Sequence, residues 1–187
     1  MLFAGGFVLA TLVRPADVLQ GSLLFGAGDL VAQRLDGGRS LDGARLAKAT
    51  GVGTVYGGLL LPASYNLAEH CFPGRSVRAI LLKASLSYTC LSLGGNYFSI
   101  AARRLLSMPP DDAGLPLPER VRRCLAGVNA DFAGVLLDDV KVWPIYDVLC
   151  FSLIPAALRP KATAVVSVCW HTYISHVAAR ERCIAVD

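Results

Sequence analysis

The chain has 187 residues, of which 54% are apolar and only 17% are charged, and its formal net charge is +4. A soluble domain typically carries about a quarter charged residues, so a chain this poor in charge is expected to face lipid. The mild net charge, without a basic cluster interleaved with aromatic side chains, argues against a nucleic-acid-binding protein.

Long apolar runs predict transmembrane helices, because about 20 mostly apolar residues are needed to cross the hydrocarbon core of a bilayer. A first run, 18–35, is broken by Asp29. Three later runs carry no Asp, Glu, Lys or Arg, and they cover residues 49–68, 84–102 and 162–179. Leu, Ala and Gly fill these runs without the alternation typical of strands, so we expect helices.

The segment 121–158 is harder to interpret, because two apolar halves flank the charged residues Asp138, Asp139 and Lys141. It is either two short helices or one long helix with a polar belt. The predicted fold is an all-α integral membrane bundle of about four transmembrane helices, with additional short or interfacial helices. We expect one multi-span domain over residues 1–187.

Polar or proline-rich connectors separate these runs at 36–40, 72–75 and 108–118. If each run spans once, the connectors 34–48 and 103–123 lie on one side of the membrane and carry nine basic residues. The opposite side carries four. The positive-inside rule therefore favours the matrix or cytosol for the first group.

Asp29 and Gln33 are the sharpest polar features of an apolar run, and their spacing of four places them on one helix face. An ionisable group inside a span is costly and should face protein or water. These two residues are candidates either for lining a pathway or for an interhelical ion pair that fixes packing. Asp147, four residues after Trp143, is a third candidate; the alternative for it is a solvated or paired carboxylate.

Gly53 and Gly57 form a G-x-x-x-G spacing, which lets two helix backbones approach closely. Nothing in the chain indicates an enzyme: we find no G-x-S-x-G motif, phosphate loop or paired carboxylates. His171 and His176 are five residues apart and do not share a face, and the six cysteines form no C-x-x-C pair. We therefore expect no catalytic, cofactor-binding or metal site, and no cofactor.

Three groups of residues carry a family resemblance. The first is Gly28, Asp29 and Gln33 in the first run. The second is Tyr65, Glu69, Pro73 and Gly74. The third and most specific comprises Trp143, Pro144, Phe151, Pro155, Arg159, Trp170, Tyr173 and Ser175. Together they make the chain similar to the Mpv-seventeen (Mpv17) family of small mitochondrial inner-membrane and peroxisomal membrane proteins, over most of its length.

The resemblance implies a four-span helical protein without enzymatic chemistry, with a channel-like or membrane-homeostasis role. It also implies the mitochondrial inner membrane as location, with the peroxisomal membrane as the alternative. The chain departs from the family at Ser64, at Ser87-Tyr88, and at Asp147 and Cys150, where family members carry other residues. Since several intramembrane polar groups are exchanged, a structural accessory subunit of a larger mitochondrial complex is the second hypothesis. The expected partners are the lipid bilayer and either further copies of the chain or other subunits.

Overall fold

The computed structural model describes residues 14–37, 40–108 and 114–179, and these ranges contain helices and no strand. The predicted all-α class is confirmed, whereas the four-span membrane bundle stays a prediction. Within the described ranges, no single helix has both the length and the hydropathy that crossing a bilayer requires. The α-helices are α2 (Pro15–Leu35), α3 (Gly43–Val55), α4 (Leu61–Cys71), α5 (Val77–Tyr88), α6 (Asn96–Leu105), α7 (Leu117–Asp139), α8 (Trp143–Leu153) and α9 (Arg159–Ala179).

Two long rods form where α-helices continue through a wider π-helical turn. The turn η1 (Tyr56–Leu60) joins α3 to α4, and η2 (Thr89–Gly95) joins α5 to α6. Each turn contains a glycine pair, and π-turns inside helices are local irregularities that often lie at functional sites. The ambiguous segment 121–158 forms two helices, α7 and α8, followed by the short 3-10 turn η4 (Ala156–Leu158).

Local signals explain where the helices begin and end. The Asp42 carboxylate accepts a hydrogen bond from Arg45 N and caps α3, and Ser76 Oγ accepts from Ala79 N and caps α5. Pro144 lies in the first turn of α8, where the missing N–H costs nothing. Gly74, with φ of +96°, makes the predicted turn between the two rods. The predicted loop 108–118 ends two residues early, since α7 already begins at Leu117; residues 109–113 lie outside the described part.

Helix α2 lies between α3 and α9 along much of its length, and the crossing with the first rod is made by glycines. A Cβ built on Gly21 would lie 2.3 Å from Gly53 O, and one built on Gly57 would lie 2.4 Å from Gly21 Cα. The predicted close approach at Gly53 and Gly57 is therefore present, with Gly21 as its partner. On the other side of α2, a Cβ on Gly28 would lie 2.9 Å from the backbone of His171 in α9.

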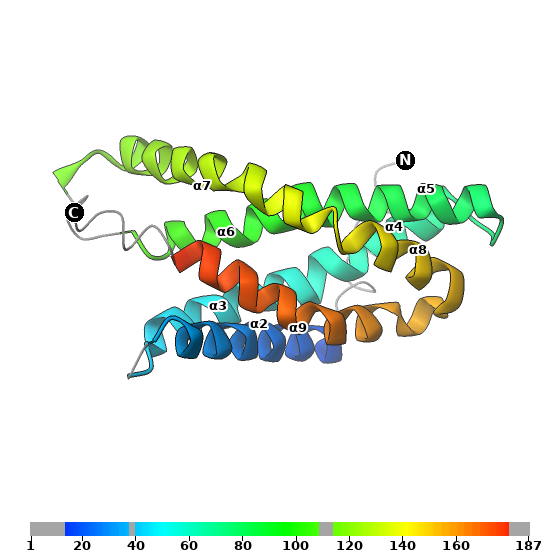
Figure 1. Cartoon of the computed structure of the whole chain (residues 1–187), viewed down its shortest axis with the longest axis horizontal. Helices are drawn as coiled ribbons and strands as arrows, with labels where there is room; N and C mark the ends of the chain where they lie inside the picture. The colour runs from blue at the N-terminus through cyan, green and yellow to red at the C-terminus, as the bar shows by residue number, and fades with distance from the viewer. Residues whose placement is uncertain (1–13, 38–39, 109–113, 180–187) are drawn as a thin grey trace, which may run out of the picture.

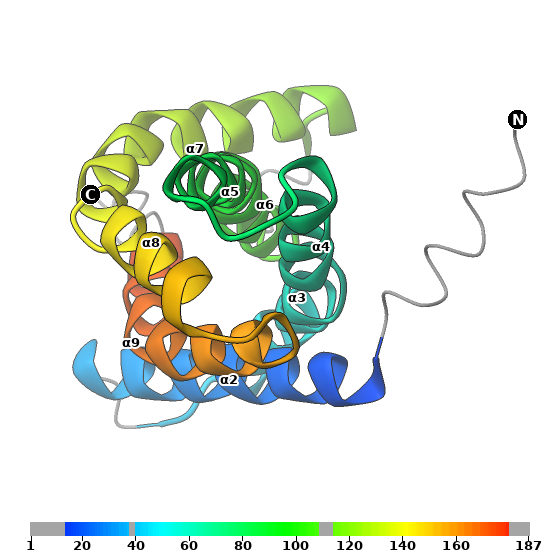
Figure 2. The same cartoon turned by 90° about the vertical axis from the view of Figure 1, so that its right-hand side faces the viewer.

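In the view along the bundle, α7 and α2 lie on opposite sides, with the rod of α5 and α6 between them and next to α7 (Figure 2). The end of α2, the start of α3 and the ends of α6 and α9 lie at one end of the bundle, which we call the basic end (Figure 1). Lys48 at the start of the first rod donates to Ser107 Oγ after α6, at 3.3 Å. The described parts of the two basic connectors thus lie at the same end, as expected if each run spans once.

Candidate functional site

Asp29 is buried at the basic end and is paired. Its exposed fraction is 1%, and Arg45 Nε donates to its Oδ1 at 2.9 Å. Gln33 Nε2 donates to Oδ2 at 2.8 Å, so the two candidates on one helix face are hydrogen-bonded to each other. Gln33 Oε1 also accepts from Asp42 N at 2.7 Å, which ties the end of α2 to the cap of α3.

Arg45 extends this network to the surface. It donates to Asp36 at 3.0 Å and to Ser175 O at 3.3 Å, and His176 of α9 contacts the same Asp36 carboxylate. Partial burial raises the pKa of Asp36, but the hydrogen bonds from His176 and Arg45 outweigh it and hold this pKa below its ordinary value. Asp36 therefore stays ionised and links the α2–α3 connector to α9.

A second polar site lies in the middle of the bundle, where Asp139 and Asp147 line one cavity. Their exposed fractions are 0% and 2%. Asn96 Nδ2 donates to Asp139 Oδ1 at 2.6 Å, while Asp147 receives no hydrogen bond from any described residue. We call this the acidic cavity; it is lined by Tyr56, Leu61, Leu91, Ser92, Asn96, Asp139, Trp143, Asp147, Thr163 and Ser167.

The acidic cavity contains no basic lining residue, and its polar lining groups are hydroxyls, an amide and the two carboxylates. Its volume of about 10 Å³ leaves room for a single water molecule. Buried charges in proteins are normally paired or bind an ion, because an isolated ion in a medium of low dielectric constant is strongly destabilised. Asp147 is thus buried, and its carboxylate makes no ion pair or hydrogen bond with the residues that the structure describes.

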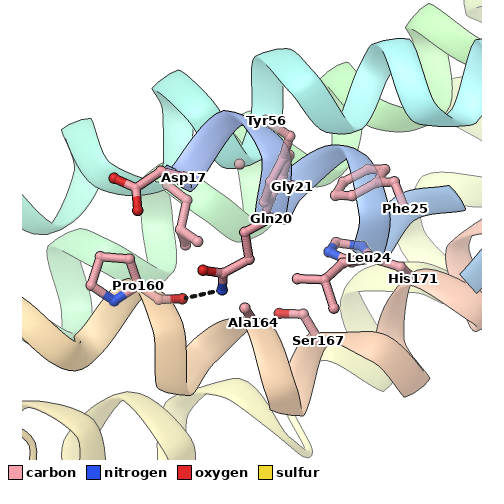
Figure 3. Close-up of a pocket in the computed structure, with 12 residues that line it drawn as sticks. Asp17, Gln20, Gly21, Leu24, Phe25, Tyr56, Pro160, Ala164, Ser167 and His171 are labelled. Carbon is pink, nitrogen blue, oxygen red and sulfur yellow. Dashed lines mark hydrogen bonds between the residues drawn. The ribbon is translucent and has the colours of Figure 1, made fainter. Parts of the chain in front are cut away.

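A neighbouring cavity shares Tyr56, Leu61 and Ser167 with the acidic cavity and continues toward α2. Figure 3 shows its lining, with Gln20 Nε2 donating to Pro160 O at 3.4 Å. Phe25 lies against His171 with ring centroids 3.7 Å apart, and its ring centroid is 5.2 Å from that of Tyr56. These three rings form an aromatic cluster at one edge of this cavity, and Phe25 lies one helical turn before Asp29 on α2.

Most residues of the predicted family signature attach α9 to other helices. Tyr65 and Thr163 share a hydrogen bond of 2.6 Å between their hydroxyls. Trp170 Nε1 donates to Asn96 Oδ1 at 3.1 Å, and Tyr173 donates to Asp138 at 2.8 Å. Trp143 packs edge-on against Trp170 and Phe151 against Tyr65, while Pro73, Pro144 and Pro155 lie at turns or helix starts.

The end of the bundle opposite the basic end carries an ion triad. The Glu69 carboxylate of α4 accepts from Lys83 Nζ of α5 at 2.7 Å and also pairs with Arg159 of α9. Lys83 donates a second bond to Gly74 O at 2.8 Å, and the Arg159 guanidinium lies over the Phe151 ring. Four residues that carry the family resemblance are thus neighbours at this end of the bundle: Glu69, Gly74, Phe151 and Arg159.

Sequence reasoning missed several partners. The charge count places Arg45 and Arg103 only in the two basic connectors, yet both approach Asp29. Asp139 was noted only as part of a charged segment, and Asn96 was not noted at all. A polar residue such as Asn96 within the otherwise apolar run 84–102 is the signal that could have indicated this site.

Comparison with known proteins supports the family resemblance. The sequence model of the Mpv17 / PMP22 family matches residues 119–175. The mitochondrial inner membrane protein Mpv17 of Xenopus laevis is 26% identical over 163 residues, covering 84% of this chain and 85% of that protein. No solved structure matches the chain.

The name of the Xenopus laevis relative agrees with the location expected from the sequence, the mitochondrial inner membrane, and a peroxisomal membrane is also consistent with the family. The match over 119–175 contains most of the C-terminal signature, from Trp143 to Ser175. The second match extends the likeness over most of the chain. The chain therefore resembles the Mpv17 / PMP22 family, as a divergent relative.

Proposed function

We propose that this membrane protein is channel-like, without enzymatic chemistry, and that its interior conducts small cations. The observation that carries the proposal is the acidic cavity, where Asp139 and Asp147 are buried together without a basic lining residue. Two carboxylates in a medium of low dielectric constant attract a cation strongly, and rings of acidic side chains confer cation selectivity on channels.

The distribution of side chains supports placement in a bilayer. Large apolar side chains are exposed on the outside of the helices, as with Leu19 and Leu23 of α2, Ile145 and Leu153 of α8, and Val165 of α9. Serines, asparagine, arginines and carboxylates are buried inside. This is the reverse of a water-soluble domain, and extended apolar surfaces indicate contact with lipid or with other proteins.

The cavities along the bundle support a path that is closed in this conformation. The acidic cavity is continuous in its lining with the cavity of Figure 3, and the rings of Phe25, Tyr56 and His171 pack together at one edge of that second cavity. Since each cavity holds only one or two water molecules, conduction requires these rings to separate.

The test is conductance of the purified full chain in planar bilayers under a KCl gradient. We expect a reversal potential on the cation-selective side. Asp147→Asn keeps the size of the side chain and removes its charge, so the K⁺ to Cl⁻ permeability ratio should fall by about tenfold. Asp139→Asn should act in the same direction.

Asp138→Asn is the matched control, because Asp138 neighbours Asp139 on α7 but is half-exposed and pairs with Lys141. It should leave the permeability ratio unchanged. An anion-selective wild type, or an Asp147→Asn channel with unchanged selectivity, would contradict the proposal.

The accessory-subunit hypothesis is the second candidate, and the Asp29 network favours it. Asp29 is buried and paired with Arg45 and Gln33, as expected for a carboxylate that fixes helix packing. Partners of the chain would then bind its exposed apolar surface. Absence of conductance, together with co-purification of a large complex after mild detergent extraction, would replace the channel by this role.

A further inference from the structure

The basic end contains a pocket that the proposed conduction path does not use, and we call it the basic pocket. It is lined by Asp29, Arg45, Lys48, Ala49, Arg103, Ser107, Ser175, Ala178 and Ala179. Its volume of about 20 Å³, on the same scale as the other cavities, leaves room for one or two water molecules, and one side of it is open. Residues from α2, the first rod, α6 and α9 meet there.

Arg103 is the unusual residue of this pocket. Its exposed fraction is 6%, and one guanidinium nitrogen, Nη1, donates to Ser175 Oγ. The other two, Nε and Nη2, have no hydrogen-bond partner in the structure. The Asp29 carboxylate is 4.0 Å from Nη1 and is already bonded to Arg45 and Gln33. A buried guanidinium with two unused donors is costly unless a ligand accepts from them.

The charges that line the pocket indicate that such a ligand is an anion. Three cations, Arg45, Lys48 and Arg103, line it against the single carboxylate of Asp29. Lys48 makes no ion pair with any described residue, and its ammonium donates only a long hydrogen bond to Ser107 Oγ. The hydroxyls of Ser107 and Ser175 add further groups able to donate to oxygen.

We propose that the basic pocket binds a phosphate group, held by Arg103 and Lys48 with the hydroxyls of Ser107 and Ser175. A guanidinium fork matches the geometry of phosphate oxygens, and an ammonium adds a point charge, so the pair supplies both orientation and attraction. The group comes either from free phosphate or from the headgroup of an acidic phospholipid, since the pocket lies at an end of the bundle. Its positive charge would hold cations away from that end of the proposed path, and a bound phosphate would cancel it; the binding proposal itself does not depend on the path.

Binding is measured as the rise in unfolding temperature of the full chain in nanodiscs. One arm adds inorganic phosphate to discs of phosphatidylcholine, with chloride at the same ionic strength as reference. The other arm replaces part of the phosphatidylcholine by phosphatidic acid. Stabilisation in the first arm assigns the site to free phosphate, and stabilisation in the second arm alone assigns it to a lipid headgroup. No stabilisation in either arm overturns the proposal.

Lys48→Gln is the main variant, because Lys48 is only half-buried and its loss leaves the Asp29 network intact. We expect it to weaken the apparent affinity by about tenfold, the loss of one charge-assisted hydrogen bond. Arg103→Lys keeps the charge but loses the fork, and should also weaken binding.

Arg34→Gln is the matched control, since Arg34 is an exposed cation at the same end of the bundle that does not line the pocket. It should bind as the wild type does. Equal weakening by Arg34→Gln and Lys48→Gln would show attraction to the overall positive charge of this end and would overturn the site.

Discussion

Gly57→Ala should lower the free energy of unfolding by about 3 kcal/mol, although it adds only one methyl group. The new Cβ would lie 2.4 Å from the Cα of Gly21, which is backbone and cannot turn aside. The first rod and α2 must therefore separate, and both the α2–α3 contact and the aromatic cluster around Phe25 lose their packing. Thermal unfolding of the purified protein in detergent or nanodiscs measures the loss.

Gly51→Ala is the matched control, because Gly51 lies in α3 of the same rod and a Cβ built there meets nothing within 4 Å. It should be neutral or slightly stabilising, since alanine is the better helix former. Gly21→Ala should match Gly57→Ala, and the double variant should cost less than the sum, because both changes act on one crossing. A Gly57→Ala protein as stable as Gly51→Ala would show that the helices do not cross here.

The spacing of residues along the chain predicts those features that depend on one helix or one turn alone. Asp29 and Gln33 share a face and are hydrogen-bonded, Pro73-Gly74 turns the chain, and Gly53 and Gly57 lie at a close crossing. These follow from helical periodicity and from the backbone freedom of glycine, which are local properties.

The partners of these residues could not be predicted from spacing, because periodicity does not give the rotation of one helix relative to another. Arg103 approaches Asp29 from α6, and Asn96 reaches Asp139 across 43 residues of sequence. Ser87-Tyr88 stand where family members carry other polar residues, and this exchange by itself argues against a pore. Yet Ser87 is buried, Tyr88 lies beside Asp139, and the acidic cavity keeps its two carboxylates on α7 and α8.

Glu69→Gln should lower the free energy of unfolding by about 2 kcal/mol, because it leaves two buried cations without their carboxylate partner. Lys83 and Arg159 are only 2% and 5% exposed, and Glu69 is their shared carboxylate. Removing one member of a buried pair costs more than the pair contributes, since an unpaired charge stays in a medium of low dielectric constant. Glu69 is itself partly exposed, which lowers the cost below that of a fully buried pair.

The same triad gives a pH dependence that separates Glu69→Gln from a general loss of packing. Partial burial raises the pKa of Glu69, but hydrogen bonds from Lys83 and Arg159 outweigh it and hold this pKa below its ordinary value near 4.5. A carboxyl with a lowered folded-state pKa stabilises fully above its unfolded pKa and loses this contribution as the pH falls through the folded one. The wild-type unfolding temperature should therefore fall below about pH 4.5, and Glu69→Gln should lack that part of the decrease.

Glu119→Gln tests whether the loss of stability expected for Glu69→Gln comes from the burial of its cations or from the loss of any ion pair. The hydrogen bond from Arg122 lowers the pKa of Glu119 to about 2, yet both of its arginine partners, Arg122 and Arg123, are exposed to water. Such pairs are screened and contribute little, so the variant should unfold as the wild type does at neutral pH. If Glu119→Gln and Glu69→Gln lowered the unfolding temperature equally, the stability of the triad end would not come from its buried cations. If only Glu69→Gln did so, the carboxylate that joins α4, α5 and α9 would be fixing that end of the bundle.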